Sequence, residues 1–309
     1  MIKNSPSNYS INRSCKAGFS LAKVKKSYLL FIGLSVFVQV KALPQTNNYF
    51  GISGALNGAV WSANPSGPYS SLLNSTGGAI LHFANAANIT GASLNVSGIN
   101  VSANLNWTNT GTLGTGGAVI PINVATGITF NMSQTTSAAV GTGFNKLGSG
   151  VLAMSGGSNY PGGFTLSEGT FIAGGVNAMG GYKLSLNGGI IASSANLDLS
   201  VKYSGGITIG GNIQWGDITG LANGTAGLTF KDSIFLGTVN RTLTLGNSGT
   251  MIFGGPISNT GAAGLTFTAN ANGNGIFEIS NTSNSFTGLV NILGGKVRFA
   301  ADEIGRAHV

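Results

Sequence analysis

Short stretches of alternating apolar and polar residues recur along the chain from about residue 144. Leu, Ile or Phe occupies every second position, and Thr, Ser, Asp or Glu occupies the positions between. A period of two places the apolar side chains on one face of a β-strand, so the pattern predicts half-buried strands and not helices. The clearest stretches are 184–186, 197–199, 207–209, 228–230, 243–245, 265–268 and 277–279.

The spacing of these strands predicts how they pack. They are short, recur about every 7 to 15 residues, and are separated by turns rich in Gly, Asn and Ser. Sandwiches and barrels use longer strands, whereas a solenoid stacks short strands coil upon coil, about 4.8 Å apart. We therefore expect an all-β chain folded as a right-handed, single-stranded parallel β-helix with roughly 20 to 25 residues per coil.

The first 42 residues have the layout of a signal peptide. A long basic region precedes an apolar run from Tyr28 to Val40. That run is too short for a transmembrane helix, which needs roughly 20 apolar residues. Small residues at Val40 and Ala42 predict cleavage between Ala42 and Leu43, so 1–42 is interpreted as a signal peptide with an extended basic n-region.

Removal of this segment changes the electrostatics of the chain. The full sequence carries a net charge of +8, but seven of its 15 Lys and Arg residues lie before Leu43, whereas all seven acidic residues lie after it. The mature chain is therefore nearly neutral, which argues against a nucleic-acid partner. The single cysteine, Cys15, leaves as well, which excludes an internal disulfide and a thiolate metal ligand in the mature chain.

An internal repeat supports the solenoid. The segment 150–155 aligns with 275–280, and 162–171 aligns with 288–297. Between these blocks the second copy carries one extra residue, which a loop at Asn159 or Asn284 can absorb.

The segment Lys146–Phe171, with its ordered glycines, apolar positions and Asn159-Tyr160 turn, resembles the autotransporter-associated β-strand repeat. Residues 177–189 are similar to the coil that commonly follows it. The resemblance implies a passenger that is exported, threaded through an outer-membrane β-barrel translocator encoded beyond Asp302, and folded outside the cell as a β-helix.

The resulting expectation for domain organisation has three parts after the signal peptide. Residues 43–143 form an N-terminal β-rich or capping part of the solenoid, and 144–302 form the β-helix, with repeats at about 144–174 and 275–299. Residues 303–309 resemble the translation of a sequencing adapter, so we expect them to be an artefact.

Candidate catalytic residues are few. A polysaccharide lyase or hydrolase on this fold needs carboxylates clustered on neighbouring coils. Asp198, Asp217 and Asp232 lie 19 and 15 residues apart, spacings close to the length of one coil, and are the candidates for such a cluster. Lys202, Lys231 and Arg241 are the candidate basic partners. The competing interpretation is that each aspartate is an isolated solvent-facing residue.

Other motifs favour structural roles. His82 lies on an alternating segment and lacks the context of a catalytic triad. Trp61, Trp107 and Trp215 could form platforms on which sugars stack, but we expect them to pack in the core or at an end cap. Gly169, Gly188 and Gly295 are expected at tight corners with positive φ. Asparagines in turns either stack into side-chain ladders between coils or adopt left-handed conformations, and we expect the second role. The candidates are Asn159, Asn187, Asn223 and Asn247.

The sequence therefore predicts a non-enzymatic surface or secreted passenger that is structural or adhesive. Its expected partners are a host or neighbouring cell surface, or a polysaccharide, with no nucleic acid, cofactor or metal. The alternatives are a carbohydrate-active β-helix enzyme, or a matrix protein held by a C-terminal sorting signal.

Overall fold

The computed structural model describes residues 46–50, 54–55, 61–66, 78–85, 87–90, 94–109, 113–114, 119–134, 143–155, 162–199, 202–216 and 224–299. The chain divides between Ala42 and Leu43, and all of these residues belong to the second unit. The predicted signal peptide, its cleavage site, Asp217 and residues 303–309 lie outside the described residues.

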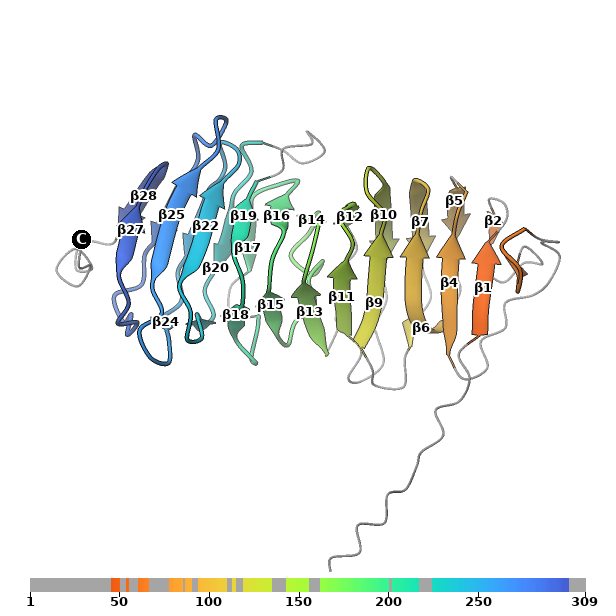
Figure 1. Ribbon diagram of the computed structural model, residues 1–309, viewed down its shortest axis with the longest axis horizontal. Coiled ribbons are helices and arrows are strands. Elements are labelled where there is room, and N and C mark those ends of the chain that lie inside the picture. The colour runs from red at the N-terminus through yellow and green to blue at the C-terminus, as the bar shows by residue number, and fades with distance from the viewer. Residues whose placement is uncertain are drawn as a thin grey trace, which may run out of the picture. The chain divides into compact units, whose positions relative to one another are not determined.

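The described residues form β-strands joined by turns and contain no helix. Three sheets, parallel except for one antiparallel pair at the edge of the first, run along the stack of coils, as Figure 1 shows. The first sheet has 12 strands, whose bounds are β1 (Thr46–Phe50), β3 (Trp61–Ser62), β4 (Ala79–Phe83), β6 (Leu94–Val101), β8 (Leu113–Gly114), β9 (Val119–Val124), β11 (Gly143–Leu147), β13 (Gly163–Leu166), β15 (Leu184–Leu186), β18 (Ile207–Ile209), β21 (Ile234–Phe235) and β24 (Ile257–Ser258).

The second and third sheets complete the coils. The second sheet has 11 strands: β2 (Gly54–Ala55), β5 (Ala87–Thr90), β7 (Leu105–Asn109), β10 (Thr129–Gln134), β12 (Val151–Met154), β14 (Thr170–Ala173), β16 (Ile190–Ser193), β19 (Ile213–Trp215), β22 (Arg241–Leu245), β25 (Leu265–Ala269) and β27 (Val290–Ile292). The third has five: β17 (Leu197–Leu199), β20 (Leu228–Phe230), β23 (Thr250–Phe253), β26 (Ile276–Ile279) and β28 (Lys296–Phe299).

This arrangement confirms the prediction of an all-β parallel solenoid. Strand pairs such as β13 with β15 and β22 with β25 are parallel and in register. From β9 to β24, successive strands of the first sheet begin about 20 to 27 residues apart, close to the expected coil length. The right-handed sense of the coil stays a prediction.

Alternation within each strand creates the core. In β15, Leu184 and Leu186 are fully buried and Ser185 between them is only half-buried, and β18 and β20 repeat this pattern. In β17 the residue between the two buried leucines is exposed. The inward-facing buried side chains of successive coils form one continuous apolar cluster. Each fully buried Leu, Ile or Phe contributes about 1.5 to 3 kcal/mol, so the fold is stabilised along its whole length and not at one centre.

The tryptophans lie in this core, as predicted. Trp61, Trp107 and Trp215 are at most 1% exposed. Trp61 belongs to β3, which pairs antiparallel with β1, and its ring packs 5.0 Å from that of Phe50. β3 therefore covers the edge of the first sheet beside β1.

The internal repeat occupies different faces in its two copies. In the first copy the aligned segments lie in β12 of the second sheet, β13 of the first sheet and the start of β14 of the second sheet. In the second copy they lie in β26 of the third sheet, β27 of the second sheet and the start of β28 of the third sheet. The aligned residues therefore lie in strands in both copies but do not share a position in the coil. The expected boundary between 143 and 144 falls inside β11, which pairs with β9 on one side and β13 on the other.

Corner glycines adopt positive φ at two of the three predicted positions. Gly169 and Gly295 have φ of 69° and 83°. The prediction for Gly188 is wrong, because its neighbour Gly189 takes this role with φ of 84°. Either glycine of the pair fits the corner, and the sequence does not distinguish them.

A buried lysine closes one corner. Lys146 has no exposed surface and lies in register between Ile122 and Leu166, both core residues. Its ammonium donates to the carbonyl oxygens of Leu147 and Gly148 at 2.8 and 2.6 Å. Burial lowers the pKa of this ammonium to about 8, against the opposing effect of the Glu168 carboxylate. Lys146 therefore satisfies backbone oxygens that the turn leaves buried.

Tyr203 provides a test of core packing. Its side chain is 1% exposed, and its hydroxyl has no hydrogen-bond partner among the described residues. Burial, and then the Asp232 carboxylate, raises the pKa of this phenol. Because an unpaired buried hydroxyl costs free energy, we expect Tyr203→Phe to leave the free energy of unfolding unchanged or raise it by up to about 1 kcal/mol in urea titrations. A loss of more than about 1 kcal/mol would show that the hydroxyl has a stabilising partner.

Candidate functional site

A ladder of asparagine side chains runs across the outer face of the second sheet. Asn88, Asn106 and Asn131 lie in register on β5, β7 and β10. The Asn131 amide donates to Asn106 Oδ1 and the Asn106 amide donates to Asn88 Oδ1, each at 2.8 Å. All three side chains are solvent-facing, because the strands point Leu105, Trp107 and Phe130 inward. The ladder therefore presents a row of oriented amides to solvent.

Hydroxyl groups form a second row beside the amides. Thr90, Thr108 and Ser133 occupy the next outward position of the same three strands and also pair in register. Ser155 and Ser194 are exposed at the ends of β12 and β16. The coils of β5, β7 and β10 thus repeat a polar pair, at an interval of about 4.8 Å set by the backbone.

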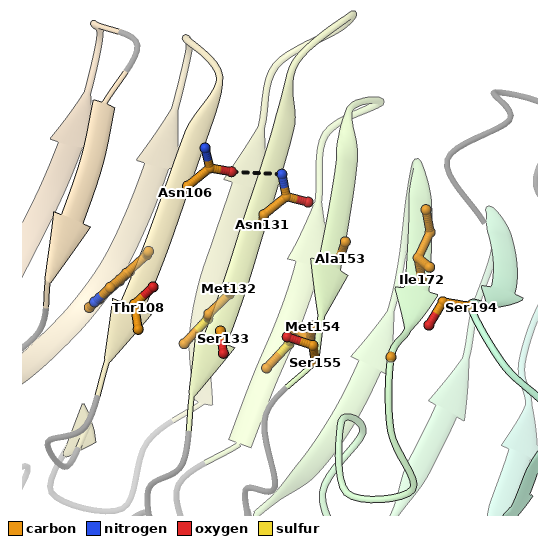
Figure 2. A pocket seen from close by; sticks show the side chains of 12 residues that line it. Asn106, Thr108, Asn131, Met132, Ser133, Ala153, Met154, Ser155, Ile172 and Ser194 are labelled. Atoms are coloured by element: carbon orange, nitrogen blue, oxygen red, sulfur yellow. Dashed lines mark hydrogen bonds between the residues drawn. The ribbon is translucent and has the colours of Figure 1, made fainter. Parts of the chain in front are cut away.

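The ladder opens into a groove of about 210 Å³ on this face. Its 12 lining residues (Figure 2) are Asn106, Trp107, Thr108, Asn131, Met132, Ser133, Ala153, Met154, Ser155, Ile172, Gly174 and Ser194. Figure 2 shows the dashed bond between Asn106 and Asn131 at one side of the groove and Ile172 at the other. None of the 12 is ionisable at neutral pH, so the groove is uncharged.

The far side of the groove is apolar. Ala153 occupies the rung after Asn131, and Ile172 and Ala192 follow in register. Ile172 and Ala192, with Val151, form a small buried cluster separate from the core, and Ala153 packs against it. The groove therefore joins an amide and hydroxyl surface to an apolar one.

Asp198, a predicted catalytic candidate, lies on a different face. It is on β17 of the third sheet, and its carboxylate accepts a 2.7 Å hydrogen bond from Lys231. It lines a hollow of about 260 Å³ with Asn196, Leu197, Gly227, Thr229, Thr250 and Ile252. Asp198 is the one carboxylate among these described lining residues, whereas glycoside hydrolysis uses a pair.

The other predicted residues have separate partners. The Asp232 carboxylate accepts the backbone N–H groups of Lys202 and Tyr203 at 2.8 Å, so it fixes a turn. The Lys202 ammonium donates to the backbone oxygen of Val176 and to Asn177 Oδ1, and burial lowers its pKa. Arg241 Nε donates to the Leu236 carbonyl at 3.2 Å. Each of these groups is bonded within a turn or to an adjacent loop.

His82 lies in β4 on the outer face of the first sheet. Its ring stacks on Tyr49 with centroids 4.4 Å apart, and its Nε2 shares a 3.0 Å hydrogen bond with Asn47 Oδ1. Burial lowers its pKa. This environment is a cross-strand contact that joins β1 to β4.

Over the residues that the structure describes, no group of three or more His, Cys, Asp or Glu residues could hold a metal ion. Within the same ranges, no helix is long and apolar enough to cross a membrane.

Comparison with known proteins gives one informative relative. No family model matches the chain, and no solved structure matches it at a significant level. Over 183 residues, which make up 58% of this chain, the sequence is 31% identical to the Adhesin BmaC autotransporter of Brucella suis biovar 1 (strain 1330). This chain is similar to an autotransporter adhesin. The match covers 4% of that relative's length. The similarity agrees with the resemblance that the repeat at 146–171 carries.

The alternating pattern alone did not predict the asparagine ladder. Its three members stand in the similar segments 87–90, 105–108 and 130–133, where an apolar residue, Asn, an apolar residue and Thr or Ser follow one another. Aligning these segments finds the ladder. The asparagines that the sequence analysis named were expected at turns. One of them, Asn247, accepts a hydrogen bond from the N–H of Gly249, two residues later in the chain, which is a turn contact. Asn159 and Asn223 lie outside the described residues.

Proposed function

We propose that this chain is part of an exported adhesive passenger displayed at the cell surface. The observation that carries the proposal is the similarity to an autotransporter adhesin in a chain that folds as a parallel solenoid. The proposed export uses residues 1–42 as the signal peptide, and a translocator or sorting signal in a longer protein holds the passenger at the outer membrane.

The solenoid supports an adhesive role by repeating surface groups at a fixed interval. Each coil of the second sheet presents side chains in rows, and the amide and hydroxyl rows of β5, β7 and β10 are solvent-facing. Individual contacts of this kind are weak, and many of them acting together give strong attachment. The proposal assigns no catalytic step to the chain.

Adhesion of coated beads tests this function. The full chain is coupled to fluorescent beads, which are incubated with host-cell monolayers and with bacterial layers and then washed. Beads that carry the native chain should remain bound in numbers well above beads that carry albumin, and the heat-unfolded chain should lose the effect. Equal retention of native-chain and albumin beads on every surface would contradict an adhesive role.

A further inference from the structure

The asparagine ladder stops one rung before the groove ends. Asn131 donates its amide to Asn106, but its own Oδ1 accepts no hydrogen bond from a described residue. The residue in register on the next coil is Ala153, whose methyl group offers no donor. Figure 2 shows the Asn131 side-chain oxygen on the side that faces Ala153. The ladder thus ends in a free amide acceptor above an apolar floor.

The polarity of the ladder strengthens this acceptor. Every bond in it runs the same way, from Asn131 to Asn106 and from Asn106 to Asn88. Hydrogen bonds in a chain polarise one another, so the terminal Asn131 Oδ1 is a better acceptor than an isolated amide. A ligand that donates an N–H group at this rung extends the chain by one bond.

The surroundings define the rest of the ligand. Ala153 and Ile172 favour a small apolar group next to the donor, and Thr108, Ser133 and Ser155 offer hydroxyls along the groove. The absence of ionisable side chains from the lining gives no compensation for desolvating a charged group. The matching ligand is neutral, carries a secondary amide with a short apolar end, and has several hydroxyl groups.

We propose that this groove binds a neutral glycan with acetamido groups, such as an N-acetylhexosamine oligomer. The acetamide N–H donates to Asn131 Oδ1, the acetyl methyl group packs on Ala153 and Ile172, and the sugar hydroxyls bond with the row of Thr108, Ser133 and Ser155. This inference rests on the proposed adhesive function and names the chemical class that the adhesin contacts.

The test compares two oligosaccharides on the full chain by isothermal titration calorimetry. The probes are the N-acetylglucosamine tetrasaccharide and the glucose tetrasaccharide of the same linkage. In the variant Ala153→Asn the new amide supplies the missing rung, fills the groove and bonds to Asn131. We expect this variant to keep the melting temperature or raise it, and to lower the affinity for the acetylated probe at least about tenfold, the loss of one good hydrogen bond.

Two further variants make the result specific. Asn131→Leu removes the acceptor but keeps a side chain of similar size. It should lower the affinity for the acetylated probe by a similar factor, so the test does not depend on one substitution. Asn291→Ala is the matched control, because Asn291 is an exposed asparagine on β27 of the same sheet, outside the groove. Its affinity for the acetylated probe should equal that of the unmodified chain.

Several outcomes would overturn the inference. The first is equal affinity for the two tetrasaccharides. The second is an unchanged affinity for the acetylated probe in folded Ala153→Asn and Asn131→Leu. The third is binding of an asparagine peptide but not of the acetylated probe. If the beads adhere while the acetylated probe does not bind, the adhesive function stands and the glycan assignment fails. If the probe binds in the groove and the beads do not adhere, the glycan assignment stands and the adhesive function fails.

Discussion

Replacing Gly169 by alanine should unfold this part of the solenoid or cost it more than about 4 kcal/mol. Gly169 has φ of 69°, a region that costs an L-residue about 1 to 2 kcal/mol. Its added Cβ would also lie 2.3 Å from the Gly148 oxygen and 2.5 Å from the Gly150 oxygen, both backbone atoms of the preceding coil. The coils cannot separate there without breaking the bond from the Thr170 N–H to the Gly150 oxygen.

Gly127→Ala is the matched control for this substitution. Gly127 has nearly the same φ, 73°, but nothing lies within 4 Å of an added Cβ. We expect this variant to lose only the conformational cost of about 1 to 2 kcal/mol. Urea unfolding, monitored by circular dichroism, measures the free energy of unfolding of both variants. Equal losses in the two variants would show that coil stacking does not constrain the corner at Gly169.

The stability of the solenoid should rise between about pH 8 and pH 10.5 because of Lys146. Burial lowers the pKa of this ammonium from 10.5 to about 8. In this window the unfolded state therefore binds more protons than the folded state, and raising the pH favours folding. The depressed pKa corresponds to about 3 kcal/mol over the whole window, as an order of magnitude.

Lys146→Met isolates this effect, because it keeps an unbranched side chain and removes the ammonium. The free energy of unfolding, measured in urea at several pH values from 7 to 10, should increase with pH in the unmodified chain by more than in the variant. Lys231→Met removes an exposed lysine, 46% accessible, and should retain the rise. Parallel pH profiles for the unmodified chain and Lys146→Met would mean that the Lys146 ammonium is not desolvated.

The architecture could be predicted from sequence because each strand carries its own signal. In 184–186, 207–209 and 228–230 apolar residues alternate with polar ones, and every one of these apolar residues is buried in the structure. The coil length followed from the spacing of such stretches. These features are local, so a single sequence contains them.

The outer surface could not be predicted in the same way, because it depends on register between coils. Asn88, Asn106 and Asn131 are 18 and 25 residues apart, since turns of different length separate strands that stack in register. The same variation limits the argument from sequence spacing for Asp198, Asp217 and Asp232, which lie 19 and 15 residues apart. The carboxylates of Asp198 and Asp232 bond to Lys231 and to the turn at 202–203 respectively, and Asp217 lies outside the described residues. The inward position of the Lys146 side chain could not be predicted either, because a lysine in an alternating strand is expected to face solvent.

Labelling of intact cells tests the central claim, export to the surface, most directly. Cells that produce the protein are treated with an antibody raised against residues 43–302, before and after lysis, with a cytoplasmic enzyme as the control for leakage. Export predicts strong labelling of intact cells and loss of that signal after mild protease treatment. Labelling that appears only after lysis would place the chain inside the cell and contradict its role as a surface passenger.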